Sequence, residues 1–228
     1  NRAIVTQGLK ILRAKKNLGL KTLIDICKIE VNPSIYHLGY FLGPRINAGG
    51  RVGKCSHGAN LLLNKDPKNS FKLASELNQY NMQRQMLEKD LLKKILSETK
   101  DCSNDPVLIM SGKDWHEGVI GIVAARLKDK FNKPVILISL DGNIGKASAR
   151  SIIGFDIGSV IIAATQEKIL IKGGGHKMAG GFSINFENIN IFKEFVFKKF
   201  KLINENLKSE KPLFFDSIIA PSAVNLEF

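Results

Sequence analysis

The chain has 228 residues, of which 44% are hydrophobic and 24% charged, and its formal net charge is +13. This composition excludes a disordered chain, and the length allows one large domain or two smaller ones. No apolar run reaches the roughly 18 residues that cross a bilayer, and the first residues do not resemble a signal peptide. The positive charge favours a polyanionic partner such as a nucleic acid.

The three cysteines are far apart, and no CxxC pair occurs. This spacing argues against a disulfide framework and a zinc knuckle, and a reducing, cytoplasmic location fits the sequence. We expect Cys27, Cys55 and Cys102 to be small buried hydrophobic residues.

Residues 3–30 are predicted to form short helices. Ile4, Leu9 and Leu12 share one apolar stripe, and Leu20, Leu23, Ile24 and Cys27 share another. The segment GYFLGPRINAGGRVG at 39–53 is rich in glycine and charge and is predicted to be a loop. That loop offers Arg45, Asn47 and Arg51 as polar groups, which could equally pair with local carboxylates.

A long helix is predicted from Asp66 to about Lys100. Asp66 suits the N-cap and Pro67 the first helical position. The apolar stripe is formed by Leu73, Leu77, Tyr80, Leu87, Leu91 and Ile95, and Arg84 interrupts it. A helix of this length with a narrow stripe is typical of a connector between two domains.

Strands and helices alternate over residues 105–208, which predicts an α/β fold. We expect strands at 107–111, 134–140, 144–150, 169–172 and 182–186, and helices at 116–131, 157–166 and 189–203. Residues 209–228, with the strand-like LFFDSII, are predicted to begin a further domain, so the chain is interpreted as a fragment.

The segment GGGHKMAGG, from Gly173 to Gly181, surrounds one histidine and one lysine with five glycines. Glycine permits positive φ and lets the backbone approach a ligand, and successive N–H groups can hold an anion. The backbone of Gly173, Gly174 and Gly175 and the side chain of His176 are therefore candidates for binding phosphate. A tight strand-to-strand connection is the structural alternative.

Two further segments carry candidate residues. In KASARS, Ser148 and Arg150 alternate by two and so face one side of a strand, next to Ser151. A hydroxyl and a guanidinium together suit a phosphate, although a solvated strand end is an equal alternative. In WHEGVIGIVAARL, His116 could contact substrate or cap the helix, Trp115 is expected to be structural, and Glu117 suits the helix dipole.

No HExxH, carboxylate cluster, metal-spaced Cys/His set or GxSxG occurs in the sequence. The residues alone therefore predict phosphate binding without a cutting centre.

The blocks GPRINAGGRVG, WHEGVIGIVAARL, KASARS and GGGHKMAGGF, in this order, resemble the RecJ-type single-stranded-DNA exonucleases of the DHH phosphoesterase superfamily. The resemblance implies the tail of a DHH domain at 1–65, a connector helix at 66–104, a DHHA1-type α/β domain with a mixed sheet at 105–208, and the start of a truncated OB-like domain at 209–228. It also implies a 5′-to-3′ exonuclease of DNA repair and recombination whose Mn²⁺ or Mg²⁺ ions bind to residues upstream of this chain.

The resemblance assigns roles to the candidate residues. Ser148 and Arg150 would hold the 5′-phosphate, His176 with the Gly173–Gly175 backbone would hold the phosphate near the metals, and Arg45 and Arg51 would stabilise charge at the scissile group. Partners would be single-stranded DNA, single-stranded-DNA-binding protein and a helicase. Two alternatives stay open: a DHH oligoribonuclease or bisphosphate phosphatase, and a non-catalytic nucleic-acid-binding module.

Overall fold

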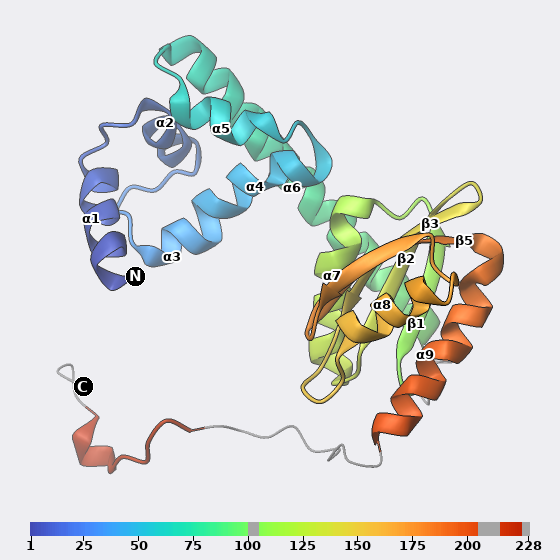
Figure 1. Ribbon diagram of the computed structural model, residues 1–228. Coiled ribbons are helices and arrows are strands. Elements are labelled where there is room, and N and C mark those ends of the chain that lie inside the picture. The colour runs from blue at the N-terminus through green and yellow to red at the C-terminus, as the bar shows by residue number, and fades with distance from the viewer. Residues whose placement is uncertain (100–104, 205–214, 225–228) are drawn as a thin grey trace.

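The protein consists of two lobes joined by one long helix, as Figure 1 shows for this computed structural model. The structure describes residues 1–99, 105–204 and 215–224. Residues 1–65 form the helical lobe, and residues 107–203 form the sheet lobe. Cys102 and parts of the expected connector and OB-like segments lie outside the described residues. No helix of the described part is long and apolar enough to cross a membrane.

The helical lobe packs around the first half of the long helix. Its elements are α1 (Arg2–Arg13), α2 (Leu18–Ile26), α3 (Ile35–His37), the π-helical turn η1 (Leu38–Leu42), α4 (Gly43–Val52) and α5 (Ser56–Leu63). The apolar core gathers Leu9, Leu12, Leu23 and Ile24 against Leu77 of α6 (Pro67–Glu98). Ile4 lies outside this core with 75% of its surface exposed, so its place in the predicted stripe is wrong.

The predicted loop at 39–53 is helical, which corrects the interpretation of its glycines. η1 and α4 run through the segment, and Gly49 lies where a Cβ would be 2.6 Å from the carbonyl oxygen of Lys54 and 3.3 Å from Leu77. The glycine is therefore needed for close packing of a helix and not for a loop conformation. Cys55 is exposed, also against expectation.

The long helix α6 begins as predicted and contributes to two cores. Asp66 accepts a hydrogen bond of 2.8 Å from the backbone N–H of Asn69, and Pro67 is the first helical residue. The second half of α6 packs its Leu91 and Ile95 against α7 (Glu117–Phe131) of the sheet lobe. A single helix therefore carries both lobes (Figure 1).

The sheet lobe is a five-stranded mixed sheet between two helical layers, which confirms the predicted α/β fold. Its strands are β1 (Leu108–Lys113), β2 (Val135–Asp141), β3 (Ile144–Arg150), β4 (Lys172–His176) and β5 (Ala179–Asn185), in the order β1-β2-β3-β5-β4. Only β1 and β2 are parallel. Its helices are α7 (Glu117–Phe131), α8 (Ile157–Gln166) and α9 (Ile189–Asn204), with the 3₁₀ turn η3 (Phe186–Asn188) before α9.

The two faces of the sheet have different cores. Leu108, Val135 and Leu137 face α6 and α7, whereas Ile136 and Ile138 face α8 and α9. The strand expected at 169–172 is wrong by its first three residues, because β4 begins at Lys172. Residues 215–224 contain only the 3₁₀ turn η4 (Pro221–Ala223), so the described part of LFFDSII is not a strand.

Candidate phosphate-binding groove

Strands β3, β5 and β4 present three rows of residues on the face of the sheet that bears α7. Paired residues of antiparallel strands lie side by side on the same face, and every second residue of a strand returns to that face. In order, the rows are Arg150, Ala179 and His176; then Ser148, Gly181 and Gly174; then Lys146, Ser183 and Lys172. Cationic rows thus border a middle row that is mostly glycine.

The second and third rows form the floor of an open groove of about 580 Å³, called here the sheet groove, and the row of Arg150 and His176 lies beside it. Glu117 and Ile120 of α7 form one wall, and Lys146, Ser148, Lys172, Gly174 and Ser183 are among the other lining residues. A Cβ added to Gly174 would meet nothing within 4 Å. The middle row therefore leaves space where any other residue would project a side chain.

The remaining glycines of GGGHKMAGG serve the opposite face. A Cβ at Gly173 or Gly180 would lie 2.7 or 2.4 Å from side-chain atoms of Ile161 on α8. In α8, a Cβ at Gly158 would lie 2.9 Å from the backbone of His176. Alternate glycines thus open the sheet groove on one face and admit α8 on the other.

This arrangement corrects the prediction of a glycine loop. Gly173–Gly175 belong to β4, Gly180 and Gly181 belong to β5, and the connecting turn is Lys177 and Met178. Among the described glycines only Gly142 and Gly154 have positive φ. The backbone conformation therefore does not support the anion nest expected at Gly173–Gly175. These residues are part of the antiparallel pairing of β4 with β5.

Arg150 and Ser148 lie together on the α7 face, as their spacing predicts. The Arg150 guanidinium donates hydrogen bonds to the Ser148 hydroxyl at 3.1 Å and to the Ala149 carbonyl at 2.7 Å. Partial burial and then the nearby Arg51 guanidinium lower the pKa of Arg150. Neither arginine has an ion pair with a carboxylate in the part of the chain that the structure describes.

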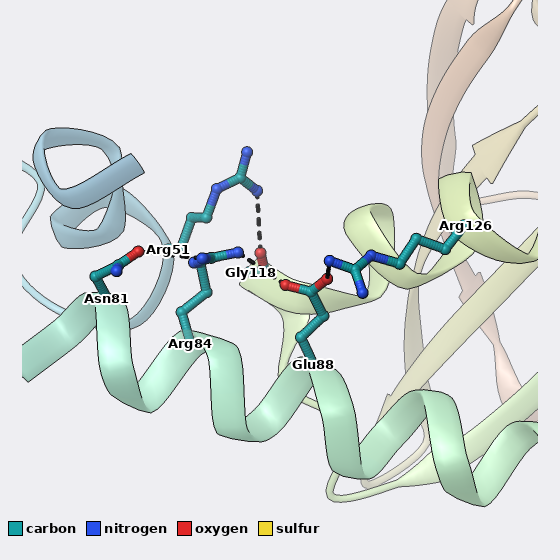
Figure 2. A network of polar contacts seen from close by, with 6 residues as sticks. All are labelled: Arg51, Asn81, Arg84, Glu88, Gly118 and Arg126. Carbon is teal, nitrogen blue, oxygen red and sulfur yellow. Dashed lines mark hydrogen bonds and ion pairs between the residues drawn. The ribbon is translucent and has the colours of Figure 1, made fainter. Parts of the chain in front are cut away.

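Arg51 reaches this position from the helical lobe. Its guanidinium donates a 3.2 Å hydrogen bond to the carbonyl of Gly118 in the first turn of α7 (Figure 2). A Cβ at Gly118 would lie only 2.0 Å from the Arg51 carbonyl oxygen, so the end of α4 touches the start of α7. Two lobes therefore supply the two arginines.

Gly121 is a second glycine of α7 that the arrangement requires. A Cβ there would lie 2.9 Å from the Ser148 hydroxyl oxygen and 3.1 Å from the terminal guanidinium nitrogen of Arg150. A methyl group there would have to displace the Ser148 hydroxyl and would crowd the end of the Arg150 side chain. Gly121 was not predicted from the sequence, since a glycine in a helix carries no sign of its neighbours.

The buried carboxylate of Glu88 holds α7 against α6, and this residue was not predicted from the sequence either. Glu88 of α6 is 2% exposed and is bound by Arg84 at 2.8 Å and by Arg126 of α7 at 2.5 Å (Figure 2). Arg84 also donates to Asn81 at 3.1 Å. The interruption of the apolar stripe by Arg84 was the available signal for a polar contact between helices.

The other predicted residues lie beside the groove or in the scaffold. His176 ends β4 in the same row as Arg150, and its Nδ1 accepts a 3.3 Å hydrogen bond from the backbone of Met178. Asn47 is exposed one turn before Arg51 on α4. His116 caps α7 by accepting a 3.1 Å hydrogen bond from Gly118.

Arg45 and Ser151 make scaffold contacts. Arg45 donates to Asn78 at 2.9 Å and to the Phe41 carbonyl at 2.8 Å, which ties α4 to α6 within the helical lobe. Ser151 is buried and donates to the Phe155 carbonyl at 2.6 Å. Neither contact involves the sheet groove.

The groove also contains two lysines that were not singled out from the sequence. Lys146 pairs with Glu117 at 2.8 Å, and Glu117 raises the pKa of Lys146. Lys172 faces Lys146 across Ser183. The same alternation that joined Ser148 to Arg150 would have found Lys146. Among the described residues, no three His, Cys, Asp or Glu side chains come together to hold a metal ion.

Comparison with known proteins identifies related sequences and structures. Residues 104–202 match the DHHA1 domain family. The chain is 35% identical over 206 residues to the single-stranded-DNA-specific exonuclease RecJ of Haemophilus influenzae, covering 85% of this chain and 35% of that protein. It is 34% identical over 193 residues to RecJ of Bacillus subtilis, covering 83% of this chain and 24% of the relative.

Solved structures agree with the sequence comparison. RecJ of Thermus thermophilus in complex with Mn²⁺ superimposes with a TM-score of 0.79 at 30% identity, over 89% of this chain and 30% of that one. A second exonuclease RecJ bound to manganese gives 0.77 at 30% identity, over 88% of this chain and 50% of that one. The chain thus spans about a quarter to a third of the length of these curated relatives. In sequence and in fold, the chain is similar to the RecJ exonucleases over most of its length, and residues 104–202 match the DHHA1 domain family.

Proposed function

We propose that this chain is the part of a 5′-to-3′ exonuclease that grips the 5′ end of single-stranded DNA. The observation that carries the proposal is that Arg51 and Arg150 both reach α7 near Ser148, and that neither arginine is ion-paired with a carboxylate of the described residues. Arg51 contacts Gly118 and Arg150 lies beside Gly121, one turn further along α7, so their two positive charges repel each other unless an anion joins them. A terminal phosphate supplies that charge and can accept bidentate hydrogen bonds from arginine.

Each groove residue has a distinct task in this proposal. Arg150, Ser148 and Arg51 bind the terminal 5′-phosphate, and the side-chain-free middle row lets the strand lie against the sheet. His176 contacts the next phosphate, which is the one cleaved. Asn47 of α4 and His116 at the start of α7 contact the strand outside the sheet groove. Arg45 supports α4 and thereby the position of Arg51.

The hydrolysis itself requires groups that the described residues do not supply, since no cluster among them suits a metal ion. The solved RecJ relatives were crystallised with Mn²⁺ or Mg²⁺. We infer that a DHH domain preceding these residues binds such ions. In the whole protein, the function would be repair and recombination in the cytoplasm, alongside single-stranded-DNA-binding protein and a helicase.

Binding of short single strands by the 228-residue chain tests the proposal. Matched oligonucleotides with a 5′-phosphate or a 5′-hydroxyl would be titrated by fluorescence anisotropy. We expect tighter binding of the phosphorylated strand, and Arg150→Ala to remove about 10- to 100-fold of that preference. Arg13→Ala, on α1 outside the groove, is the matched control and should retain the preference. Equal binding of both strands by the unaltered chain contradicts the proposal.

A further inference from the structure

The row of the sheet groove that lies farthest from Arg150 and His176 is cationic. Lys146 and Lys172 flank Ser183, and all three line the groove. This row, called here the lysine row, lies two residues along each strand from Ser148, Gly181 and Gly174. Two residues of antiparallel strand span about 7 Å. The lysine row is thus one side-chain length away from the hydroxyl of Ser148.

The two lysines differ in their partners. Lys146 is paired with Glu117 at 2.8 Å, and both side chains are about half exposed. Lys172 has no ion pair among the residues described by the structure. An exposed ion pair in water is weak, so the Lys146 ammonium can exchange Glu117 for a stronger anion at little cost.

The direction in which the DNA strand runs along the sheet groove decides which anion can reach the lysine row. If the first 5′-phosphate lies at Ser148 and Arg150 and the strand leaves past His176, as the proposed function has it, the lysine row lies on the far side of the 5′ end. No further nucleotide of the strand extends in that direction. The groups that can continue there are further phosphates attached to the terminal one.

We propose that the lysine row binds the outer phosphates of a 5′-di- or triphosphorylated strand, so that the sheet groove accepts polyphosphate ends as well as monophosphate ends. This inference rests on the proposed function for its polarity. The lysine ammoniums act as point charges for phosphate oxygens, and the Ser183 hydroxyl donates a hydrogen bond between them. Glu117 repels the same phosphates and weakens their binding.

Binding of three strands of one sequence, with 5′-hydroxyl, 5′-monophosphate and 5′-triphosphate ends, tests the inference on the 228-residue chain. We expect the triphosphate to bind about tenfold tighter than the monophosphate. Lys172→Ala should remove this gain while the preference of monophosphate over hydroxyl stays. Glu117→Gln should enlarge the gain, and Lys10→Ala on α1, as the control, should leave it unchanged.

The outcomes separate this inference from the proposed function. Triphosphate binding no tighter than monophosphate binding, while the monophosphate still exceeds the hydroxyl, overturns the lysine row as a polyphosphate site and leaves the proposed function intact. Equal weakening of all three strands by Lys172→Ala also overturns it, since the lysines would then contact the body of the strand. Equal binding of monophosphate and hydroxyl ends overturns the proposed function itself.

Discussion

The carboxylate of Glu88 on α6 lies 2.5 Å from the guanidinium of Arg126 on α7, and it also binds Arg84 at 2.8 Å. The Glu88 side chain is 3% exposed, whereas that of Arg126 is 59% exposed. The ion pair therefore joins a buried carboxylate of α6 to a guanidinium at the surface of the contact between α6 and α7. Because α7 carries Gly118 and Gly121, this contact sets the position of the wall that faces Ser148 and Arg150.

The first prediction is that Glu88→Ala destabilises the protein strongly. Removal of the carboxylate leaves Arg84 without its partner in a largely buried place, and breaking such a pair costs about 3–5 kcal/mol of unfolding free energy. Urea unfolding followed by circular dichroism measures this loss. Asp129→Asn, which breaks the more exposed contact with Lys128, is the control and should cost less than about 1 kcal/mol. Similar losses in both variants would show that Glu88 is no more important than a surface charge.

The second prediction concerns Gly121→Ala. Alanine is favoured over glycine inside a helix by about 0.5–1 kcal/mol, so α7 itself should become more stable. The added methyl group would nevertheless crowd the Ser148 hydroxyl and the Arg150 guanidinium. We expect the preference for 5′-phosphorylated over 5′-hydroxyl strands to fall several-fold, by the loss of about one charge-assisted hydrogen bond. Anisotropy titration with both strands measures it.

Gly8→Ala provides the control for this variant. Gly8 lies in α1, where an added Cβ would meet nothing within 4 Å, so the substitution should stabilise a helix without changing the strand preference. An unchanged preference in Gly121→Ala would mean that the terminal phosphate does not enter between α7 and β3.

The sequence predicted the helices and the first three strands of the sheet lobe well, because their apolar runs are bounded by clear turn and cap residues. The helix at 157–166 has the predicted bounds, and Asp156 caps it. The loop predicted at 39–53 failed for a physical reason. Its glycines allow helices to approach closely, and propensity alone cannot distinguish that use from a turn.

Only the relative placement of site residues on one β-strand was predictable from the sequence. Alternation placed Ser148 and Arg150 on one face, which the structure confirms. The row that joins Arg150 to His176 depends on the pairing of β3 with β5 and of β5 with β4, which local patterns do not specify. The proximity of Arg51 to Arg150 likewise depends on the contact between two lobes far apart in sequence.

The third prediction concerns Asp156 and acid stability. A backbone hydrogen bond from Ser159 is the main reason that the pKa of Asp156 is lowered. A carboxylate whose pKa is lower in the folded state stabilises the fold above its unfolded pKa of about 4, and this contribution is lost as the pH falls through the folded value. Asp156→Asn retains a capping side chain but does not titrate. We therefore expect the variant to lose less stability than the unaltered chain between pH 5 and pH 2, both values being approximate limits of the titration.

Thermal unfolding at several pH values checks this expectation. Asp129→Asn is a suitable control, since the Asp129 carboxylate accepts no capping hydrogen bond and lies on the exposed end of α7. Parallel acid curves for Asp156→Asn and the unaltered chain would show that the cap of α8 does not contribute to acid sensitivity.

The last prediction separates the roles of Arg150 and His176 in a longer protein that contains this chain and a DHH domain. Arg150 lies beside Ser148 and Arg51, where a terminal phosphate would bind, whereas His176 lies two strands away in the same row. Arg150→Ala should therefore slow degradation of 5′-phosphorylated strands about 10- to 100-fold more than that of 5′-hydroxyl strands. His176→Ala should slow both substrates by the same factor, because the phosphate to be cleaved is present in both. The ratio of the two initial rates is the quantity to measure for each variant. A ratio that Arg150→Ala leaves at its original value would assign this arginine to the scaffold, and a ratio changed by His176→Ala would place the histidine at the 5′ end instead of the scissile phosphate.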